Sequence, residues 1–304
     1  MRILALTALV LSAAAAALLF TGCASRKCRP NETSSPVAGQ SCFATSATNK
    51  VHYVVAGRGS HTLVFVHCWA GNLGFWREQV PALADRARLI LIDLPGHGQS
   101  DKPQTDYTMD YFAGAVLAVM RDVRVDQTTL IGHSMGVPVI CRVYAQAPEK
   151  VAALVSVDGA LRRLALTAEQ IEQFVGPLRT PEYRDYTARF VGSMFPNPGT
   201  EGLRDQVLCE LFATPQYVML SAMENLFSPD RPDWALAKVN VPVLVLNTKN
   251  PMWTPEYEAY VRSLSSQTDY RVMEGPGHWL MLERPAEFNA ILTDMLNKFG
   301  LIAQ

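Results

Sequence analysis

The sequence has few charged residues and no excess of either sign. Lys and Arg together number 27 and Asp and Glu 28, so the formal net charge is −1, and charged residues make up only 18% of the 304 residues. Proteins that bind nucleic acid need a basic surface that neutralises phosphates. We therefore expect no nucleic-acid partner. Hydrophobic residues make up 49%, which is enough for a large core.

Motifs that bind metal ions are also missing. The chain has no Cys-x-x-Cys, His-x-His or His-Glu-x-x-His spacing, so we expect no metal and no cofactor. Cys68, Cys141 and Cys209 lie in apolar surroundings, which favours buried structural residues. Cys28 and Cys42 flank a segment rich in Pro, Ser and Asn. In an oxidising compartment this pair closes a small loop, and otherwise both remain free thiols.

The N-terminal segment differs from the rest of the chain, which contains no internal repeat. Arg2 precedes an uninterrupted stretch of apolar and small residues at 3–20, a pattern typical of a secretory signal peptide. An uncleaved membrane anchor is the alternative, because this length is close to the shortest that spans a bilayer. We expect a signal peptide at 1–22, followed by a tether at 23–45.

The end of this segment, Leu-Phe-Thr-Gly-Cys at residues 19–23, resembles the lipobox of bacterial lipoproteins. Phe20 departs from the usual aliphatic residue. The resemblance implies that Cys23 is lipidated and becomes the mature N-terminus. Several acyl chains would hold the protein stably at a membrane surface. The rest of the chain would then be extracytoplasmic, in the periplasm or at the cell surface.

After the tether, short apolar runs alternate with segments of helical character. This alternation predicts an α/β fold with a doubly wound, mostly parallel sheet. The insert at 161–233 is rich in aromatic residues and prolines and predicts a helical cap over a core at 46–160 and 234–304. The expected strands lie at 51–56, 63–67, 88–93, 128–132, 152–158 and 241–247, and the expected helices at 76–84, 110–121, 135–147, 254–264 and 285–299.

The most informative motif is the G-x-S-x-G sequence at residues 132–136, between an apolar run and a helical stretch. A strand that turns sharply into a helix leaves no room for side chains beside the central residue, and its hydroxyl projects outward. The helix N-terminus adds N–H groups that stabilise developing negative charge. The motif predicts that Ser134 is a nucleophile.

Four segments together resemble the α/β-hydrolase fold family, close to its single-chain esterase, perhydrolase and epoxide-hydrolase-like branch. The resemblance covers about residues 51–299. It rests on the turn His-Cys-Trp-Ala-Gly at 67–71, the loop Asp-Leu-Pro-Gly-His-Gly-Gln-Ser at 93–100, the elbow around Ser134 and the histidine loop at 275–285. In the family's numbering the cap follows the sixth strand. A serine at the elbow, where other branches have aspartate, disfavours epoxide-hydrolase and haloalkane-dehalogenase chemistry.

The base follows from chain order. In this fold the partners come after the nucleophile, and His278 is the only histidine beyond Ser134. His97 and His133 receive no proton-transfer role, and His67 is expected to brace the turn that follows it.

The acid is where the sequence departs from the family. The loop after the seventh strand, residues 247–255, contains no carboxylate. Asp158 ends a core strand, and some branches take their acid from that position, so it is our candidate. The alternatives are that Asp158 only caps a turn, that the Asn250 amide orients the imidazole, or, third, that Glu256 does.

The oxyanion donors are expected on the backbone. One is the N–H of Met135, directly after the nucleophile, and the other is the N–H of Trp69 in the turn after the third strand. Cys68 stands where the family normally has glycine.

These residues predict a serine hydrolase that cleaves an ester or related acyl bond through an acyl-enzyme. The apolar cap suggests a small hydrophobic acyl substrate. Two alternatives stay open: a surface-anchored binding protein with impaired catalysis, and a cofactor-free perhydrolase. The sequence does not indicate an oligomeric state.

Overall fold

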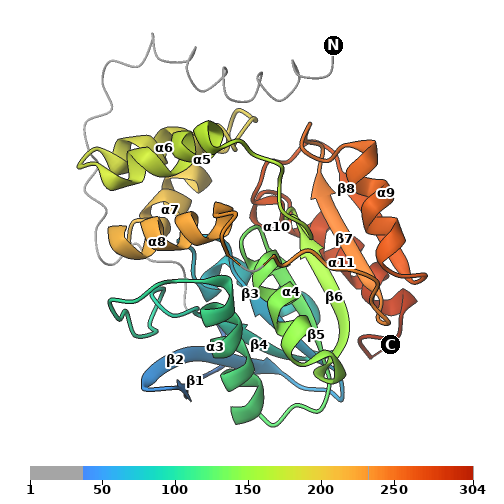
Figure 1. Cartoon of the computed structure of the whole chain (residues 1–304). Helices are drawn as coiled ribbons and strands as arrows, with labels where there is room; N and C mark the ends of the chain where they lie inside the picture. The colour runs from blue at the N-terminus through green and yellow to red at the C-terminus, as the bar shows by residue number, and fades with distance from the viewer. Residues whose placement is uncertain (1–36, 232, 304) are drawn as a thin grey trace.

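The computed structural model describes residues 37–231 and 233–303. Eight strands form one sheet in the order β1-β2-β4-β3-β5-β6-β7-β8 (Figure 1). β2 pairs antiparallel with β1 and β4, and the remaining pairs are parallel. The doubly wound, mostly parallel sheet is thus confirmed. Its strands are β1 Gln40–Ser46, β2 Asn49–Gly57, β3 Thr62–Val66, β4 Arg88–Ile92, β5 Thr128–His133, β6 Val151–Val157, β7 Val243–Thr248 and β8 Thr268–Met273.

The two outermost strands were not predicted. β1 occupies residues that we assigned to the tether at 23–45, so this assignment is wrong from Gln40 onward. Only Ala44 of β1 and two of the six residues of β8 are buried, because an edge strand has one neighbour and little contact with the core. Neither strand carries the apolar run that marked the inner ones.

The helices cover both faces of the sheet. In Figure 1, α3 and α4 lie side by side in front of the strands, and α11 lies behind them. Gln79 donates hydrogen bonds to the Met281 carbonyl and to Asn289, which joins the short helices to α11. These helices are η1 Leu73–Trp76, α2 Val80–Leu83, α3 Met109–Asp122, α4 Gly136–Gln146, η2 Pro148–Lys150, α9 Pro255–Leu264, α10 Leu280–Glu283 and α11 Pro285–Lys298.

The segment between β6 and β7 is helical, as expected for a cap inserted after the sixth strand. It lies beyond the carboxyl ends of the parallel strands (Figure 1). Its elements are α5 Ala168–Val175, η3 Gly176–Arg179, α6 Tyr183–Gly192, α7 Glu201–Leu211 and α8 Gln216–Phe227.

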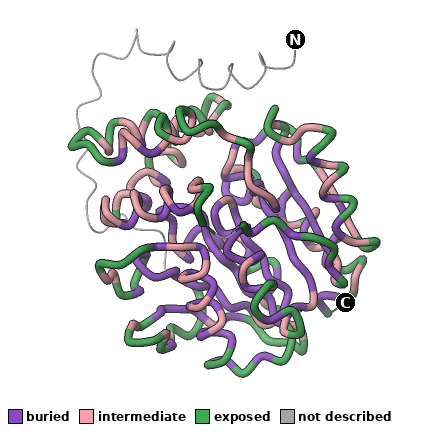
Figure 2. Tube along the Cα trace, viewed as in Figure 1, coloured by how far each residue is buried: buried purple, intermediate pink, exposed green. Residues whose placement is uncertain are grey.

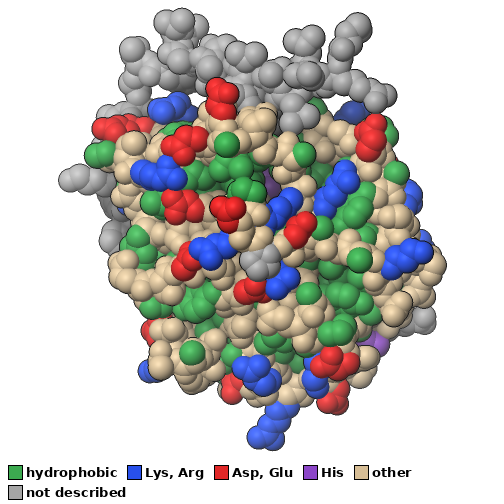
Figure 3. All heavy atoms as spheres, viewed as in Figure 1, with side chains coloured by type: hydrophobic (Ala, Val, Ile, Leu, Met, Phe, Trp, Pro, Cys, Tyr) green, Lys and Arg blue, Asp and Glu red, His purple; other side chains and the backbone are tan. Residues whose placement is uncertain are grey.

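The core lies along the central strands, where every residue of β3, β5 and β7 is buried (Figure 2). On the face shown in Figure 3, acidic and basic side chains are interspersed. No helix within residues 37–231 and 233–303 is long and apolar enough to cross a membrane. The predicted signal peptide, the tether up to residue 36 and Cys23 lie outside the described residues.

The structure decides between the alternatives for Cys42 and differs from expectation at Cys209. Cys42 is a free thiol, which rules out the loop closed by Cys28 and Cys42. Cys209 is disulfide-bonded and half-buried, whereas we expected a buried structural residue. Cys68 and Cys141 are buried free thiols, as predicted.

Candidate active site

Ser134 lies on a strained turn between β5 and α4. Its φ is +53°, in the left-handed region that residues with a Cβ rarely adopt. The flanking glycines are required by close backbone contacts. A Cβ at Gly132 would lie 2.5 Å from the Gly136 carbonyl oxygen, and one at Gly136 would lie 2.5 Å from that of Val66. The G-x-S-x-G motif therefore forms the sharp turn that the sequence predicts.

The sheet register brings Ser134 and Asp158 to the same edge. The last residues of two adjacent parallel strands, His133 of β5 and Val157 of β6, are paired. Ser134 and Asp158 follow them directly, and the Ser134 N–H donates to the Val157 carbonyl at 3.0 Å. Both residues thus project from the carboxyl ends of the strands, where α/β folds bind their ligands.

Asp158 contacts the predicted base. Its Oδ2 accepts a hydrogen bond from Nδ1 of His278 at 2.7 Å, and its carboxylate is buried. Its Oδ1 accepts from the Thr248 N–H, the Thr248 hydroxyl and the Trp253 indole, each at 2.9 Å. The loop after β7, which has no carboxylate of its own, thus supplies donors that hold the one from β6.

These contacts determine the protonation of the pair. Burial alone would raise the pKa of Asp158, but the hydrogen bond and charge of His278, with those from Thr248 and Trp253, lower it below its usual value. The carboxylate is therefore ionised and accepts the Nδ1 hydrogen. This leaves Nε2 of His278 available for the proton of a nucleophile.

The side chain of Asn250, the first alternative, serves a local turn. The Asn250 side-chain oxygen accepts a hydrogen bond from the Met252 N–H at 2.9 Å, which closes a local turn. Glu256 is exposed in the first turn of α9. Of the three candidates, Asp158 is the one in contact with the imidazole.

The cap contacts the histidine loop, residues 275–285, through Met194 and Phe195. The His278 N–H donates to the carbonyl of Met194 at 3.2 Å, and the Trp279 ring stacks on Phe195 with centroids 5.0 Å apart. A Cβ at Gly277 would lie 2.0 Å from the Met194 oxygen. Gly277 is therefore needed for the close approach of the cap.

His133 contacts His278 from the end of β5, a contact that the sequence did not reveal. Its Nε2 donates to the His278 carbonyl at 2.9 Å, and the two rings lie 4.7 Å apart between centroids. Burial, and secondly the charge of His278, lowers the pKa of His133 to about 3. The ring is therefore a neutral support. Its position inside the G-x-S-x-G motif hid this role, because every signal there points to Ser134.

The predicted oxyanion donors lie on two fixed segments. Met135 is the N-cap residue of α4, so its N–H is among those that a helix leaves without an internal acceptor. The Trp69 indole donates to the Met219 carbonyl at 2.8 Å, and the Thr214 hydroxyl donates to the carbonyl of Ala70 at 2.9 Å. The cap thus holds the turn that carries the Trp69 N–H.

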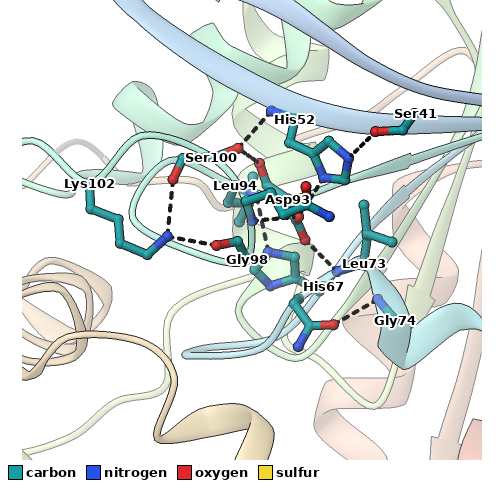
Figure 4. A network of polar contacts seen from close by, with 12 residues as sticks. Ser41, His52, His67, Leu73, Gly74, Asp93, Leu94, Gly98, Ser100 and Lys102 are labelled. Atoms are coloured by element: carbon teal, nitrogen blue, oxygen red, sulfur yellow. Dashed lines mark hydrogen bonds and ion pairs between the residues drawn. The ribbon is translucent and has the colours of Figure 1, made fainter. Parts of the chain in front are cut away.

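His67 braces the same turn, as expected. Its Nδ1 donates to the Cys68 carbonyl at 2.7 Å. Its Nε2 accepts from the Leu94 N–H at 3.0 Å (Figure 4). Burial lowers the pKa of His67 and raises that of Cys68 to about 12, so the imidazole is neutral and the thiol protonated. The buried His97 donates to the Pro95 carbonyl at 2.9 Å, and its ring packs against those of His67 and Phe112. No group of His, Cys, Asp and Glu suited to a metal ion occurs in the part of the chain that the structure describes.

Comparison with known proteins agrees with this fold. The sequence profile of a family described as the alpha/beta hydrolase fold matches residues 61–285. A curated relative, the dihydrolipoyllysine-residue acetyltransferase component of the acetoin cleaving system of Cupriavidus necator, is 27% identical over 250 residues, which cover 80% of this chain. The chain spans 65% of that relative's length. It spans 33% of the length of the same component from Pseudomonas putida and 41% of the length of an uncharacterized hydrolase of Bacillus subtilis.

Solved structures share the fold. The enol-lactonase from Burkholderia xenovorans LB400 has a TM-score of 0.75 and 21% identity, covering 84% of this chain and 100% of that one. An esterase from Thermogutta terrifontis has a TM-score of 0.74 and 22% identity, and the match covers 86% of this chain and 99% of the esterase.

Proposed function

Because the chain belongs to the α/β-hydrolase fold family, we propose that it is a serine hydrolase that cleaves an ester or related acyl bond through an acyl-enzyme. The observation that carries the proposal is the 2.7 Å hydrogen bond between His278 and the buried carboxylate of Asp158, beside the strained elbow of Ser134. This arrangement combines a nucleophile, a base and an orienting acid.

In the first half-reaction, the Ser134 hydroxyl attacks the acyl carbon and its proton passes to Nε2 of His278. The Asp158 carboxylate stabilises the imidazolium, which then protonates the leaving alcohol. In the second half-reaction, the same imidazole takes a proton from water, which releases the acid and restores Ser134.

The negative charge on the carbonyl oxygen of the intermediate is assigned to the N–H groups of Met135 and Trp69. Their segments are held by helix α4 and by the cap, so both donors are in place before the substrate arrives. Preorganised donors of this kind contribute about 3 to 4 kcal/mol to transition-state stabilisation.

For the substrate, we propose a small hydrophobic acyl group. Two aromatic side chains of the cap pack on the two site loops: Phe195 stacks on Trp279, and Phe190 meets Trp69 edge to face at 6.5 Å. Apolar side chains at these places favour a substrate whose acyl part carries no charge.

The alternative of a binding protein with impaired catalysis loses its main support. It depended on the loop after β7 lacking a carboxylate, and Asp158 from β6 contacts the imidazole instead. Hydrolysis and perhydrolysis use the same residues, and no contact in the site favours perhydrolysis.

The test is to measure ester turnover by the Ser134→Ala variant on a panel of acyl esters of varied chain length. We expect turnover to fall by several powers of ten, because the change removes the nucleophile and only one oxygen atom. Ser263→Ala, at an exposed serine on α9, is the matched control and should retain full activity. Activity near the wild-type level in Ser134→Ala would rule out the serine mechanism.

A further inference from the structure

A second hydrogen-bonded chain of serine, histidine and aspartate joins β1, β2 and the residue after β4 (Figure 4). The Ser41 hydroxyl oxygen lies 2.8 Å from Nε2 of His52, and His52 Nδ1 lies 2.7 Å from Oδ2 of Asp93. Ser41 is on β1, His52 is on β2 and Asp93 directly follows β4. These residues take no part in the site around Ser134.

The partners of Asp93 determine the direction of this chain. Its carboxylate is buried and also accepts hydrogen bonds from the N–H groups of Leu73, at 2.8 Å, and Gln99, at 2.9 Å. Because the carboxylate is surrounded by donors, it acts as an acceptor, and Nδ1 of His52 carries the hydrogen. In the neutral imidazole Nε2 is then an acceptor, and the Ser41 hydroxyl donates to it. The hydrogen bond between His52 and Asp93 thus runs in the same direction as the one between His278 and Asp158.

The imidazole of His52 is fixed and shielded from solvent. It is 1% exposed, its backbone N–H donates to the Ser100 hydroxyl at 2.8 Å, and the Phe43 ring lies against it with centroids 5.1 Å apart. Ser41, in contrast, is exposed. The hydroxyl therefore offers an incoming molecule access to a buried base.

The edge of the sheet supplies the surroundings that a substrate needs. β1 is the terminal strand, and no described strand pairs with its outer edge. The backbone N–H and carbonyl of His52 form hydrogen bonds with Ser100 and Asp93, away from β1. Phe43 is paired with His52 in the sheet register, so the N–H and carbonyl of Phe43 point to the outer edge of β1. Those of Ser41, two residues earlier, point the same way. The N–H groups of both residues are therefore not used in pairing with β2. The Phe43 ring, 50% exposed on the same face, offers an apolar surface.

We propose that Ser41 is a second nucleophilic serine, which accepts acyl groups from activated donors such as aryl esters. The Ser41 oxygen bonds to the acyl carbon as the bond from that carbon to the aryl oxygen breaks. The serine proton passes to Nε2 of His52 and then to the departing aryl oxide. The products are a phenol and O-acylated Ser41, and no further reactant is needed.

The test uses a fluorophosphonate probe on the full-length chain carrying Ser134→Ala. Attack by a serine oxygen on phosphorus expels fluoride and leaves a stable adduct, which intact mass and peptide mapping locate. We expect one adduct, on Ser41. Adding Ser41→Ala should abolish it, whereas Ser46→Ala on the same strand is the matched control and should leave it unchanged. Labelling of the folded chain should be about a hundredfold faster than that of the urea-unfolded chain, because general base assistance requires the fold.

Three results would overturn the proposal: no adduct on the folded Ser134→Ala chain, an adduct that survives Ser41→Ala, or equal labelling rates in the folded and unfolded chain. The wild-type chain separates this proposal from the hydrolase function. Labelling of Ser134 alone counts against the second nucleophile only, and labelling of Ser41 alone counts against the first.

Discussion

Asp158 is the residue on which the proposed chemistry depends most. Its carboxylate accepts one hydrogen bond from His278 and three from the loop after β7. We expect Asp158→Asn to lower kcat by about 10³ to 10⁴, because the imidazole loses its orienting acceptor and the charge that stabilises imidazolium. Asn250→Ala should change kcat little, since the Asn250 side chain serves a local turn.

Steady-state kinetics of the two variants, with circular dichroism to exclude misfolding, gives the ranking. A strongly impaired Asn250→Ala beside an active Asp158→Asn would place the orienting group after β7 instead. A gain of activity in Asn250→Asp would show that the chain works below capacity for want of a carboxylate in that loop.

Much of the site could be predicted from sequence because its residues stand at strand ends beside recognisable glycines. Ser134 and His278 were identified in this way, and Asp158 because it ends an apolar run. The support that His133 gives to His278 could not be predicted. It depends on a contact between residues 145 positions apart, and a lone histidine carries no signal for such a contact.

The sharp turn at Ser134 requires a residue without a Cβ at Gly136, which can be tested by substitution. A Cβ at Gly136 would lie 2.5 Å from the Val66 carbonyl oxygen, so Gly136→Ala must displace α4 or β3. We expect a loss of about 1–3 kcal/mol in the free energy of unfolding. Gly114→Ala in α3 is the matched control: a Cβ there meets nothing within 4 Å, and the change should stabilise by up to about 1 kcal/mol. Urea unfolding of both variants measures the difference, and equal stabilities would contradict this account of the motif.

The elements differ in how far the sequence reveals them. Inner parallel strands such as β3 and β7 are buried on both faces and read as continuous apolar runs, which made them predictable. β1 and β8 have one neighbour each, so solvent replaces much of the packing that would otherwise demand apolar residues. The division of the cap into separate helices also escaped prediction, because aromatic residues and prolines interrupt its helical periodicity.

For the chain as a whole, buried neutral histidines predict an acid-sensitive fold. Burial lowers the pKa of His133 to about 3 and also lowers those of His67 and His97, against about 6.5 in an unfolded chain. Below pH 6.5 the unfolded chain therefore binds more protons than the folded chain. Each histidine then reduces stability by up to about 1.4 kcal/mol per pH unit.

Urea unfolding at pH 7.5, 6.5 and 5.5 measures this dependence. The free energy of unfolding should change little between the first two values and fall between the last two. The lowered pKa of Asp158 adds its own loss only at more acidic pH, when that carboxylate begins to protonate. Stability that rises from pH 6.5 to 5.5 would contradict the assignment of neutral histidines.

We also propose that the mature protein begins at a lipidated Cys23 and is held at a membrane surface outside the cytoplasm. The proposal rests on the sequence of residues 1–23, with Arg2 ahead of the apolar stretch. Intact mass should show an acylated N-terminal cysteine, and fractionation should place the protein with membranes. Cys23→Ser should remove the acyl groups from the intact mass. A wild-type product that is cleaved elsewhere or still carries Met1 would refute the lipoprotein assignment.

The hydrogen bonds between cap and core have a consequence for how substrate enters. The Met194 carbonyl holds the base loop, while Met219 and Thr214 hold the oxyanion turn. Lifting the cap as a rigid lid would break these bonds together and release both the proton acceptor and the anion donors. We therefore expect turnover only while the cap stays bound to the two site loops. Under the proposed hydrolase function, we therefore expect the closed cap to limit the size of the acyl group that reaches Ser134.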